Sequence, residues 1–218
     1  FLYLCVKKMG KIIKSVVYSN FEAIQSIMEL YKIEVFDLDC TYSKGAFWKN
    51  LPIPIVRSDI EPLDDTILKA DSRNLPFEND TLHSIMFDPP FNIGGKNYKN
   101  NKEGSSIISK RFGAYASFEE LKEHYKSSLI EFNRILAKNG ILVFKCQDTV
   151  SGGKNHFSHL FVVQTAIELG FYPRDLFVLV ANTRINPYGS VWKNQEHARK
   201  YHSYFLIFEK KPCRVDYN

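Results

Sequence analysis

The sequence has few cysteines, and they do not form a metal-binding or disulfide pattern. Its four cysteines lie far apart, without a C-x-x-C pair, and the six histidines share no ligand spacing with them. This argues against a zinc site and against a disulfide framework. We therefore expect no metal cofactor and, as the default for such a chain, a reducing cytoplasmic location.

Long apolar runs are also missing. No stretch approaches the roughly 20 apolar residues that a membrane-spanning helix needs. The apolar residues 1–6 are followed by Lys7 and Lys8, the reverse of the order in a signal peptide. We expect no membrane partner. Residues 1–19 are expected to be an N-terminal extension, with Met9 a candidate for the natural start.

The sequence contains no internal repeat and no linker. Its 218 residues suffice for one domain with a sizeable core, and are too few for two. Hydrophobic residues make up 44% and charged residues 24%, values typical of a globular protein. We therefore predict a single domain over residues 1–218.

Apolar segments alternate between strand-like and helix-like periods. Helices are expected at 20–30, with Asn20 as N-cap, from a capping box at Ser117 and Glu120 to a stop at Asn139-Gly140, and at 155–169. Strands are expected at 33–38, 53–57, 67–70, 81–87, 141–145, 176–181 and 204–208. This order predicts an α/β fold: a seven-stranded, mainly parallel sheet with helices on both faces and an antiparallel last strand.

Four predicted strands end in polar residues. Asp39 begins a small polar turn, Asp59 and Asp71 follow the next two strands, and Asp88 follows the fourth. Ligands of open α/β sheets bind along the edge formed by the carboxyl ends of the strands. The shared position of these acids therefore predicts one site at that edge.

The net charge of +5 is unevenly distributed. Residues 57–88 contain eight acids and three bases, whereas residues 92–111 contain five bases and one acid. An acidic zone followed by a basic segment suits a cationic cofactor beside a site for phosphates. The alternative is that these charges lie on solvated surfaces.

These motifs resemble those of a known family. Asp39-x-Thr-Tyr-x-x-Gly45, Asp59, Asp71 with Leu75-Pro-Phe, and Asp88-Pro-Pro-Phe91 are similar to the motifs of class I S-adenosylmethionine-dependent methyltransferases. More narrowly, they resemble small phage-type and plasmid-type DNA methylases that act on amino groups. The resemblance covers roughly residues 30–210 and implies the Rossmann-like fold of that class and S-adenosyl-L-methionine as cofactor.

The segment Asp88-Pro89-Pro90-Phe91 also suits this chemistry on physical grounds. An amino nitrogen conjugated to a base ring is a poor nucleophile because its lone pair is delocalised. Asp88 and the Pro89 carbonyl can accept hydrogen bonds from its two N–H groups. Consecutive prolines form a stiff segment that has no N–H donors. Phe91 offers a ring for stacking. We predict all four residues to be catalytic, in a reaction that depends mainly on positioning.

The resemblance also implies the cofactor site. The acid after the second strand would bind ribose hydroxyls and the acid after the third the adenine amino group. The residues carried over are Asp39, Thr41, Tyr42, Ser43, Gly45, Asp59, Asp71 and Leu75. Ser43 departs from the family, which commonly has glycine there, because glycine permits positive φ. This departure leaves open a non-catalytic binding module.

Two polar segments, 92–116 and 182–202, are expected to bind the substrate. They combine cations with aromatic rings, the mixture expected for nucleic acid. The substrate-binding candidates are Lys96, Lys110, Arg111, Phe112, Lys145, Arg199, Lys200 and His202. The alternative is a pair of solvated loops.

The resemblance favours N6 of adenine in DNA, because serine rather than aspartate is more typical of the first motif position in the cytosine enzymes. N4-cytosine DNA methylation and an RNA base methyltransferase stay open. A protein-glutamine methyltransferase is disfavoured, because those enzymes resemble Asn-Pro-Pro-Tyr. In duplex DNA the target base would first have to be flipped out.

Overall fold

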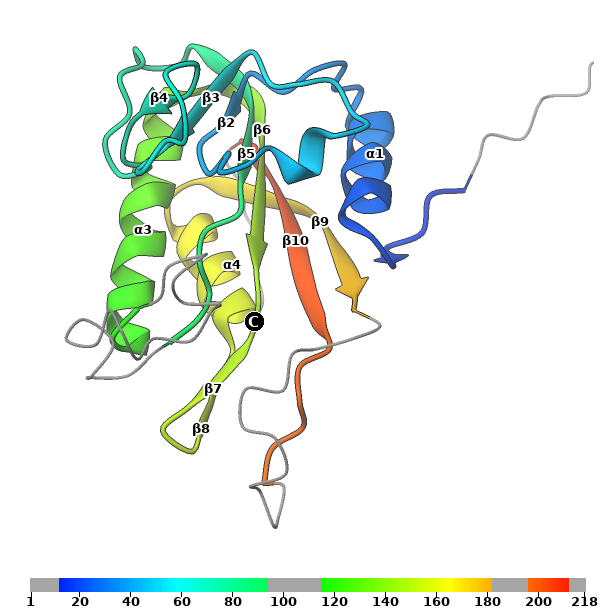
Figure 1. Cartoon of the computed structure of the whole chain (residues 1–218), viewed down its shortest axis with the longest axis vertical. Coiled ribbons are helices and arrows are strands. Elements are labelled where there is room, and N and C mark those ends of the chain that lie inside the picture. Colours follow the sequence, from blue (N-terminus) through cyan, green and yellow to red (C-terminus); the bar gives the residue numbers. More distant parts are fainter. Residues whose placement is uncertain (1–11, 94–114, 182–195, 212–218) are drawn as a thin grey trace, which may run out of the picture.

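A twisted eight-stranded sheet forms the centre of the protein in a computed structural model, which describes residues 12–93, 115–181 and 196–211 (Figure 1). The strand order is β1-β9-β10-β6-β5-β2-β3-β4. The strands are β1 (Val16–Val17), β2 (Leu38–Asp39), β3 (Val56–Asp59), β4 (Leu68–Lys69), β5 (Leu82–Phe87), β6 (Leu136–Cys146), β9 (Phe171–Val180) and β10 (His202–Lys210).

All pairings in the sheet are parallel except those of β10, which is antiparallel to both β6 and β9. A mainly parallel sheet with an antiparallel last strand was predicted. The eighth strand is β1, which pairs with β9 from within the expected N-terminal extension. A strand of two residues is too short to give a sequence signal, so the prediction counted seven strands.

Three α-helices and one short 3₁₀-helix are described. They are α1 (Asn20–Tyr31), η1 (Ala46–Trp48), α3 (Phe118–Ile135) and α4 (Ser158–Glu168). Ser117 caps α3 as predicted, with its Oγ accepting from the Glu120 amide at 3.2 Å. The predicted cap of α1 was wrong by one residue, because the Oγ of Ser19, not Asn20, accepts from the Glu22 amide.

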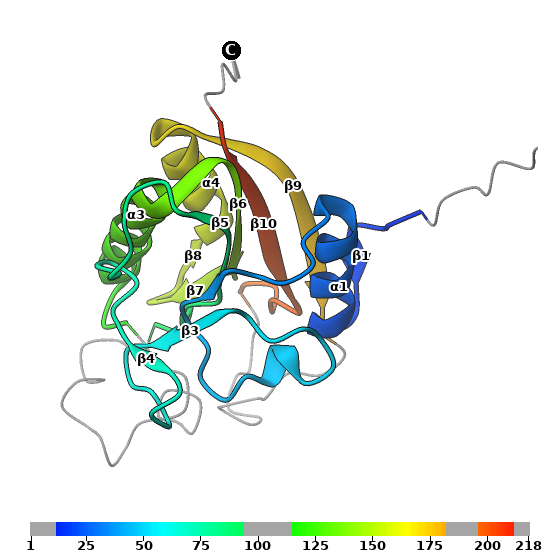
Figure 2. The same ribbon diagram turned by 90° about the horizontal axis from the view of Figure 1, so that it is seen from above.

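The helices cover both faces of the sheet (Figure 2). In β5, Ile85 and Phe87 belong to a core beneath α3 and α4, while Met86 between them belongs to a core beneath α1. This alternation follows from the period of two in a strand. Burial on both faces explains why the central strands are continuous apolar runs in the sequence.

Two further local predictions were wrong. Asn139-Gly140 does not stop α3, which ends at Ile135; the pair lies inside β6, where Asn139 has a φ of 63° and the pairing with β5 shifts register. Residues 151–154 were expected to be a flexible segment, but they form the turn of a hairpin between β7 (Thr149–Ser151) and β8 (Lys154–His156).

Within the described ranges, no helix is long and apolar enough to cross a bilayer.

Candidate active site

The topology brings three of the predicted acids to adjacent strands. β2 lies between β3 and β5, so Asp39 at the end of β2 is flanked by Asp59 at the end of β3 and by Asp88 directly after β5. Asp71 follows β4, the edge strand beyond β3. The carboxyl edge of the sheet therefore carries all four acids, as expected for this type of fold.

Asp39 is buried and bonded within the chain. Its Oδ2 accepts from Trp48 Nε1 at 2.7 Å, and its Oδ1 accepts from the Thr41 amide at 2.9 Å. Thr41 Oγ1 in turn accepts from the Asp88 amide at 2.8 Å. Burial raises the pKa of Asp39 to about 7, against the lowering effect of the Trp48 and Thr41 hydrogen bonds. Asp39 thus fixes the first turn and, through Thr41, the backbone at Asp88.

The first turn is joined to the second acid. Ser43 has a φ of 50°, and its amide donates to Asp59 Oδ2 at 2.9 Å. The left-handed conformation costs a non-glycine residue about 1–2 kcal/mol, which gives a reason for the glycine common in the resembled family. Asp59 Oδ1 accepts from the Glu61 amide at 3.0 Å. Each carboxylate oxygen retains a second lone pair for a ligand hydroxyl.

Gly45 in the same turn has no room for a side chain. Its φ is 63°, and a Cβ there would lie 2.5 Å from the Tyr42 hydroxyl oxygen. The Tyr42 ring also faces the Arg57 guanidinium, 5.5 Å from the ring centre. Tyr42 therefore lies folded over the turn.

Asp71 and Leu75 belong to a loop held by ion pairs. Arg73 Nε donates to both oxygens of Asp71, at 2.9 and 3.1 Å, and these bonds lower the pKa of Asp71. The Leu75 amide donates to Glu131 Oε1 at 2.7 Å. Arg134 pairs with Glu131 at 2.7 Å and also donates to the carbonyl of Leu75 at 3.1 Å. The loop is thereby anchored to α3.

Asp88 presents one occupied and one unpartnered oxygen. Its Oδ2 accepts from Lys145 Nζ at 3.2 Å, whereas its Oδ1 is fully covered and has no hydrogen-bond partner among the described residues. Lys145, at the end of β6, lies over the rings of Phe47 and Phe205, 4.8 and 5.5 Å from their centres. Burial raises the pKa of Asp88, although Lys145 opposes this.

The prolines after Asp88 are fixed from the α3 side. The Tyr125 hydroxyl, in the middle of α3, donates to the Pro90 carbonyl at 2.9 Å. Pro89 is buried, and Phe91 is partly exposed. The Tyr115 amide donates to the Asn92 carbonyl at 2.9 Å, and Ile93 forms a bridge with Tyr115. Tyr115 therefore lies beside the residues that directly follow the motif.

His124 connects these parts and was missed in the sequence, since a histidine in the middle of a helix gives no signal. Its Nε2 lies 3.0 Å from Ser72 Oγ, beside Asp71, and its Nδ1 bonds the Tyr115 hydroxyl. Burial lowers the pKa of His124 to about 4. The imidazole is therefore neutral at pH 7 and bridges the Asp71 loop to the return point of the chain.

This burial predicts loss of stability in acid. The pKa of His124 is lower in the folded than in the unfolded state, so its contribution is present above about pH 6.5 and is lost as pH falls toward 4. The full difference between the two pKa values corresponds to about 3 kcal/mol. Urea unfolding at pH 7 and 5 should show a smaller loss in His124→Gln than in the wild type. The exposed His83→Gln should keep the wild-type loss; equal losses in all three proteins would refute the assignment.

The predicted substrate residues fall into two groups. Lys96, Lys110, Arg111 and Phe112 lie outside the described residues. Lys145 contacts Asp88, and Arg199, Lys200 and His202 lie on the segment that enters β10. Of these candidates, Lys145 contacts the motif directly, through Asp88.

A second polar cluster lies at this edge, and the contacts within it were not predicted. Asp148 is buried after β6, with Oδ1 2.7 Å from His159 Nδ1 and Oδ2 accepting from the Tyr204 hydroxyl at 3.3 Å. His202 Nε2 lies 2.9 Å from the same hydroxyl. Asp148 and Tyr204, 56 positions apart, meet here because β6 and β10 are neighbours, which the sequence pattern could not reveal. His202 is thus a member of this cluster. Across the described residues, no three His, Cys, Asp or Glu side chains group as metal ligands.

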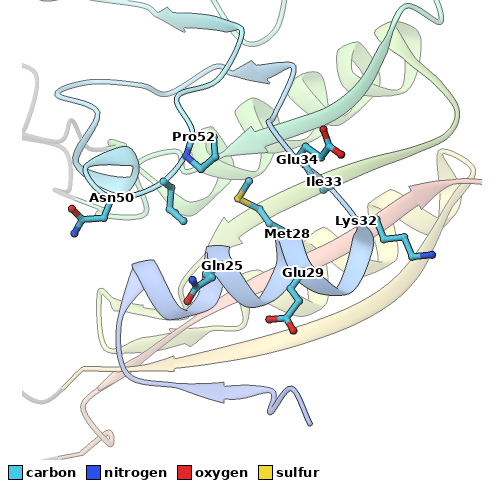
Figure 3. A pocket seen from close by; sticks show the side chains of 9 residues that line it. Gln25, Met28, Glu29, Lys32, Ile33, Glu34, Asn50 and Pro52 are labelled. Carbon is cyan, nitrogen blue, oxygen red and sulfur yellow. The ribbon is translucent and has the colours of Figure 1, made fainter. Parts of the chain in front are cut away.

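A broad hollow in the surface lies elsewhere. It has a volume of about 570 Å³ and is formed by α1 and by the segments entering β2 and β3 (Figure 3). Its wall combines Glu29, Lys32 and Glu34 with the apolar Met28 and Pro52. Because it adjoins the amino ends of these strands, it is separate from the edge that carries the acids.

No protein-family model matches the sequence. No curated protein matches it either.

Comparison with solved structures, in contrast, finds proteins of similar structure. A chain in the complex between the Haloferax volcanii Trm112 methyltransferase activator and a provisionally assigned methyltransferase is 12% identical, with a TM-score of 0.51 over 88% of this chain and 90% of that one. A provisionally assigned DNA modification methylase from Thermus thermophilus, complexed with S-adenosyl-L-methionine, is 18% identical with a TM-score of 0.43, over 68% and 56% of the two chains. The cytosine-N4-specific PvuII DNA methyltransferase is 17% identical with a TM-score of 0.45, over 66% and 49%.

The match with a TM-score of 0.51 supports the fold alone. The Rossmann-like fold of class I methyltransferases is confirmed for this chain. The chain spans about half the length of the first Thermus thermophilus structures that it matches, 53% in one of them.

Proposed function

We propose that the protein is an S-adenosylmethionine-dependent methyltransferase that acts on the exocyclic amino group of a nucleic-acid base, with N6 of adenine in DNA favoured. The observation that carries this proposal is the Asp88 carboxylate. Lys145 fixes one oxygen, and the other is covered and unpartnered within the described structure. A buried acceptor without a donor is costly unless a ligand supplies one. An amino group of a base is such a donor.

The residues of the first turn and of β3 suit the cofactor. The left-handed Ser43 and Gly45 bring the backbone to the strand ends without bulky side chains, and Asp59 has lone pairs left for two ribose hydroxyls. Leu75 would line the adenine side, with Asp71 beside it. Asp39 and Thr41 would act indirectly, because their hydrogen bonds fix the first turn and the backbone at Asp88. When bound, S-adenosylmethionine supplies a methyl group attached to a sulfonium centre.

Groups of the protein itself would make the amino nitrogen more nucleophilic. Asp88 Oδ1 would accept a hydrogen bond from one N–H group of the amino group, and the Pro89 carbonyl would accept one from the other. These two bonds would localise the lone pair on the nitrogen. The nitrogen would take the methyl group that the bound cofactor supplies and would then lose a proton toward Asp88. Tyr125 holds the Pro90 carbonyl, so the segment stays rigid. Phe91 offers its ring to the base.

The test is direct identification of the product. The protein would be incubated with labelled S-adenosylmethionine and with DNA and RNA oligonucleotides of the same sequence, and the digested nucleosides would be identified by mass. N6-methyladenine from DNA is the expected result. Label in RNA alone, or in N4-methylcytosine, would replace the favoured substrate with one of the other two candidates.

Calorimetry with S-adenosylmethionine separates an enzyme from a binding module. A bound cofactor should also raise the unfolding temperature with concentration. Neither heat nor thermal stabilisation would favour a non-catalytic module, the alternative prompted by Ser43.

A further inference from the structure

Three segments that are separate in sequence meet beyond the end of β6. They are the β7–β8 hairpin, the start of α4, and residues 196–201, and all lie at the lower end of the sheet in Figure 1. His197 Nε2 lies 3.0 Å from the Gly153 carbonyl oxygen in the hairpin turn. Lys200 Nζ lies over the ring of Phe157, 6.0 Å from its centre. We call the exposed face of these segments the hairpin surface.

Three large apolar side chains of the hairpin surface are exposed. Phe157 is 51% exposed, Leu160 58% and Tyr201 39%. Phe157 and Leu160 are three residues apart at the start of α4, so they share one side of the helix. An exposed group of rings and aliphatic side chains at a functional edge is typical of an interaction surface.

The same surface carries positive charge. Lys154 lies in the hairpin, and Arg199 and Lys200 lie on the segment that packs against it; Arg199 is 5.8 Å from the centre of the Tyr201 ring. Glu196 is the one acid in residues 196–201. Rings interleaved with cations match a strand that offers both phosphates and base faces.

The hairpin follows the candidate active site closely along the chain. Lys145, which contacts Asp88, precedes the first residue of the hairpin by four positions, a reach of at most about 14 Å in an extended chain. Tyr204 pairs with Cys146, so the segment that enters β10 runs beside the same strand end. This short separation places the hairpin surface within reach of the nucleotides that neighbour a base held at Asp88.

We propose that the hairpin surface binds an unpaired stretch of nucleic acid next to the target nucleotide. Bases stack on Phe157 and Tyr201, and phosphates contact Lys154, Arg199 and Lys200. An unpaired strand fits because base faces are available for stacking on exposed rings only where the strand is not part of a duplex. This inference rests on the proposed function, of which it names the form of the substrate.

The test compares two matched double variants. Phe157→Ala with Lys200→Ala removes one ring and one cation from the hairpin surface. Tyr172→Ala with Lys211→Ala removes an equivalent pair, 5.9 Å apart, from the amino end of β9 at the opposite edge. Fluorescence anisotropy would measure the binding of labelled single-stranded DNA, single-stranded RNA and duplex DNA of one sequence at two salt concentrations.

The first variant should bind single strands at least about tenfold more weakly, the effect expected from one stacking ring and one phosphate contact. The slope of log K against log salt should fall by about one. The control should stay within about twofold of the wild type. Equal losses in both variants, or tighter binding of the duplex by the wild type, would overturn the inference. Comparison of single-stranded DNA with single-stranded RNA would show whether deoxyribose or ribose is preferred.

Lys200→Glu leaves the ring in place and should weaken binding further than Lys200→Ala, and thermal unfolding would show that each variant is folded. A methyl-transfer assay on the same variants keeps this result separate from the proposed function. Binding that depends on the hairpin surface without methyl transfer would refute the proposed function alone. Methyl transfer that is the same in the wild type and in the hairpin variants would refute the surface alone.

Discussion

Replacement of Asp88 by alanine is expected to reduce methyl transfer by about a thousandfold or more, while S-adenosylmethionine binding stays within a few-fold of the wild type. The loss is large because the carboxylate is proposed to accept the N–H bond in the transition state, where such groups contribute factors of about 10²–10⁴. Transfer of labelled methyl to oligonucleotides would measure the rate, and calorimetry the cofactor affinity.

Two additional variants make this result specific. Asp88→Ala leaves Lys145 buried without its partner, so Asp88→Asn, which keeps the shape, checks that the loss is not one of folding. Asp65→Ala removes an exposed acid from the same acidic zone and should leave the rate unchanged. Normal turnover by Asp88→Ala would contradict the proposed mechanism.

Replacement of Glu131 by alanine is expected to lower the free energy of unfolding by about 3 kcal/mol. Glu131 is 8% exposed and accepts from both the Leu75 amide and Arg134. Burial opposes its ionisation, but the bonds from Arg134 and Leu75 outweigh this and lower the pKa of Glu131. In Glu131→Ala, the buried Leu75 amide and the Arg134 guanidinium lose their hydrogen-bond acceptor. Urea unfolding would measure the change, and calorimetry should show weaker cofactor binding because the loop of Asp71 and Leu75 loosens.

The same helix supplies a control. Glu119 pairs with Lys122 at the same three-residue spacing and a similar distance, 2.6 Å, but its side chain is 77% exposed. Glu119→Ala should cost no more than about 1 kcal/mol, because exposed ion pairs contribute little. A similar cost for both variants would mean that Glu131 acts only as a surface charge.

The sequence was most informative where one residue type has one strong structural role. The run ending at Asp88-Pro89 predicted a buried strand and its end, and β5 ends at Phe87. Ser117 and Glu120 predicted the start of α3 correctly. Strand and helix alternation predicted the fold class. The proposed roles of the site residues stay predictions.

The errors have physical causes. Gly140 was interpreted as a helix stop, but the chain had already entered β6, where a positive φ at Asn139 accommodates a shift of register. Gly152-Gly153 is a strong signal for a hairpin between two strands, and was interpreted as flexibility because the strands are three residues each. Contacts such as Trp48 with Asp39 depend on how the turn folds back, which no local pattern specifies.

The bridge between Ile93 and Tyr115 has a consequence for how such a protein could diversify. The two ends of the segment between them are fastened at one point, by backbone pairing and by the Tyr115 hydroxyl on His124. Doubling the length of a segment closed in this way costs only about 0.6 kcal/mol of chain entropy. On the proposed function, insertions, deletions or exchanges between residues 94 and 114 would alter which sequence is recognised, and the sheet would be unchanged. The bridge thus allows the length of this stretch to change at little cost in stability.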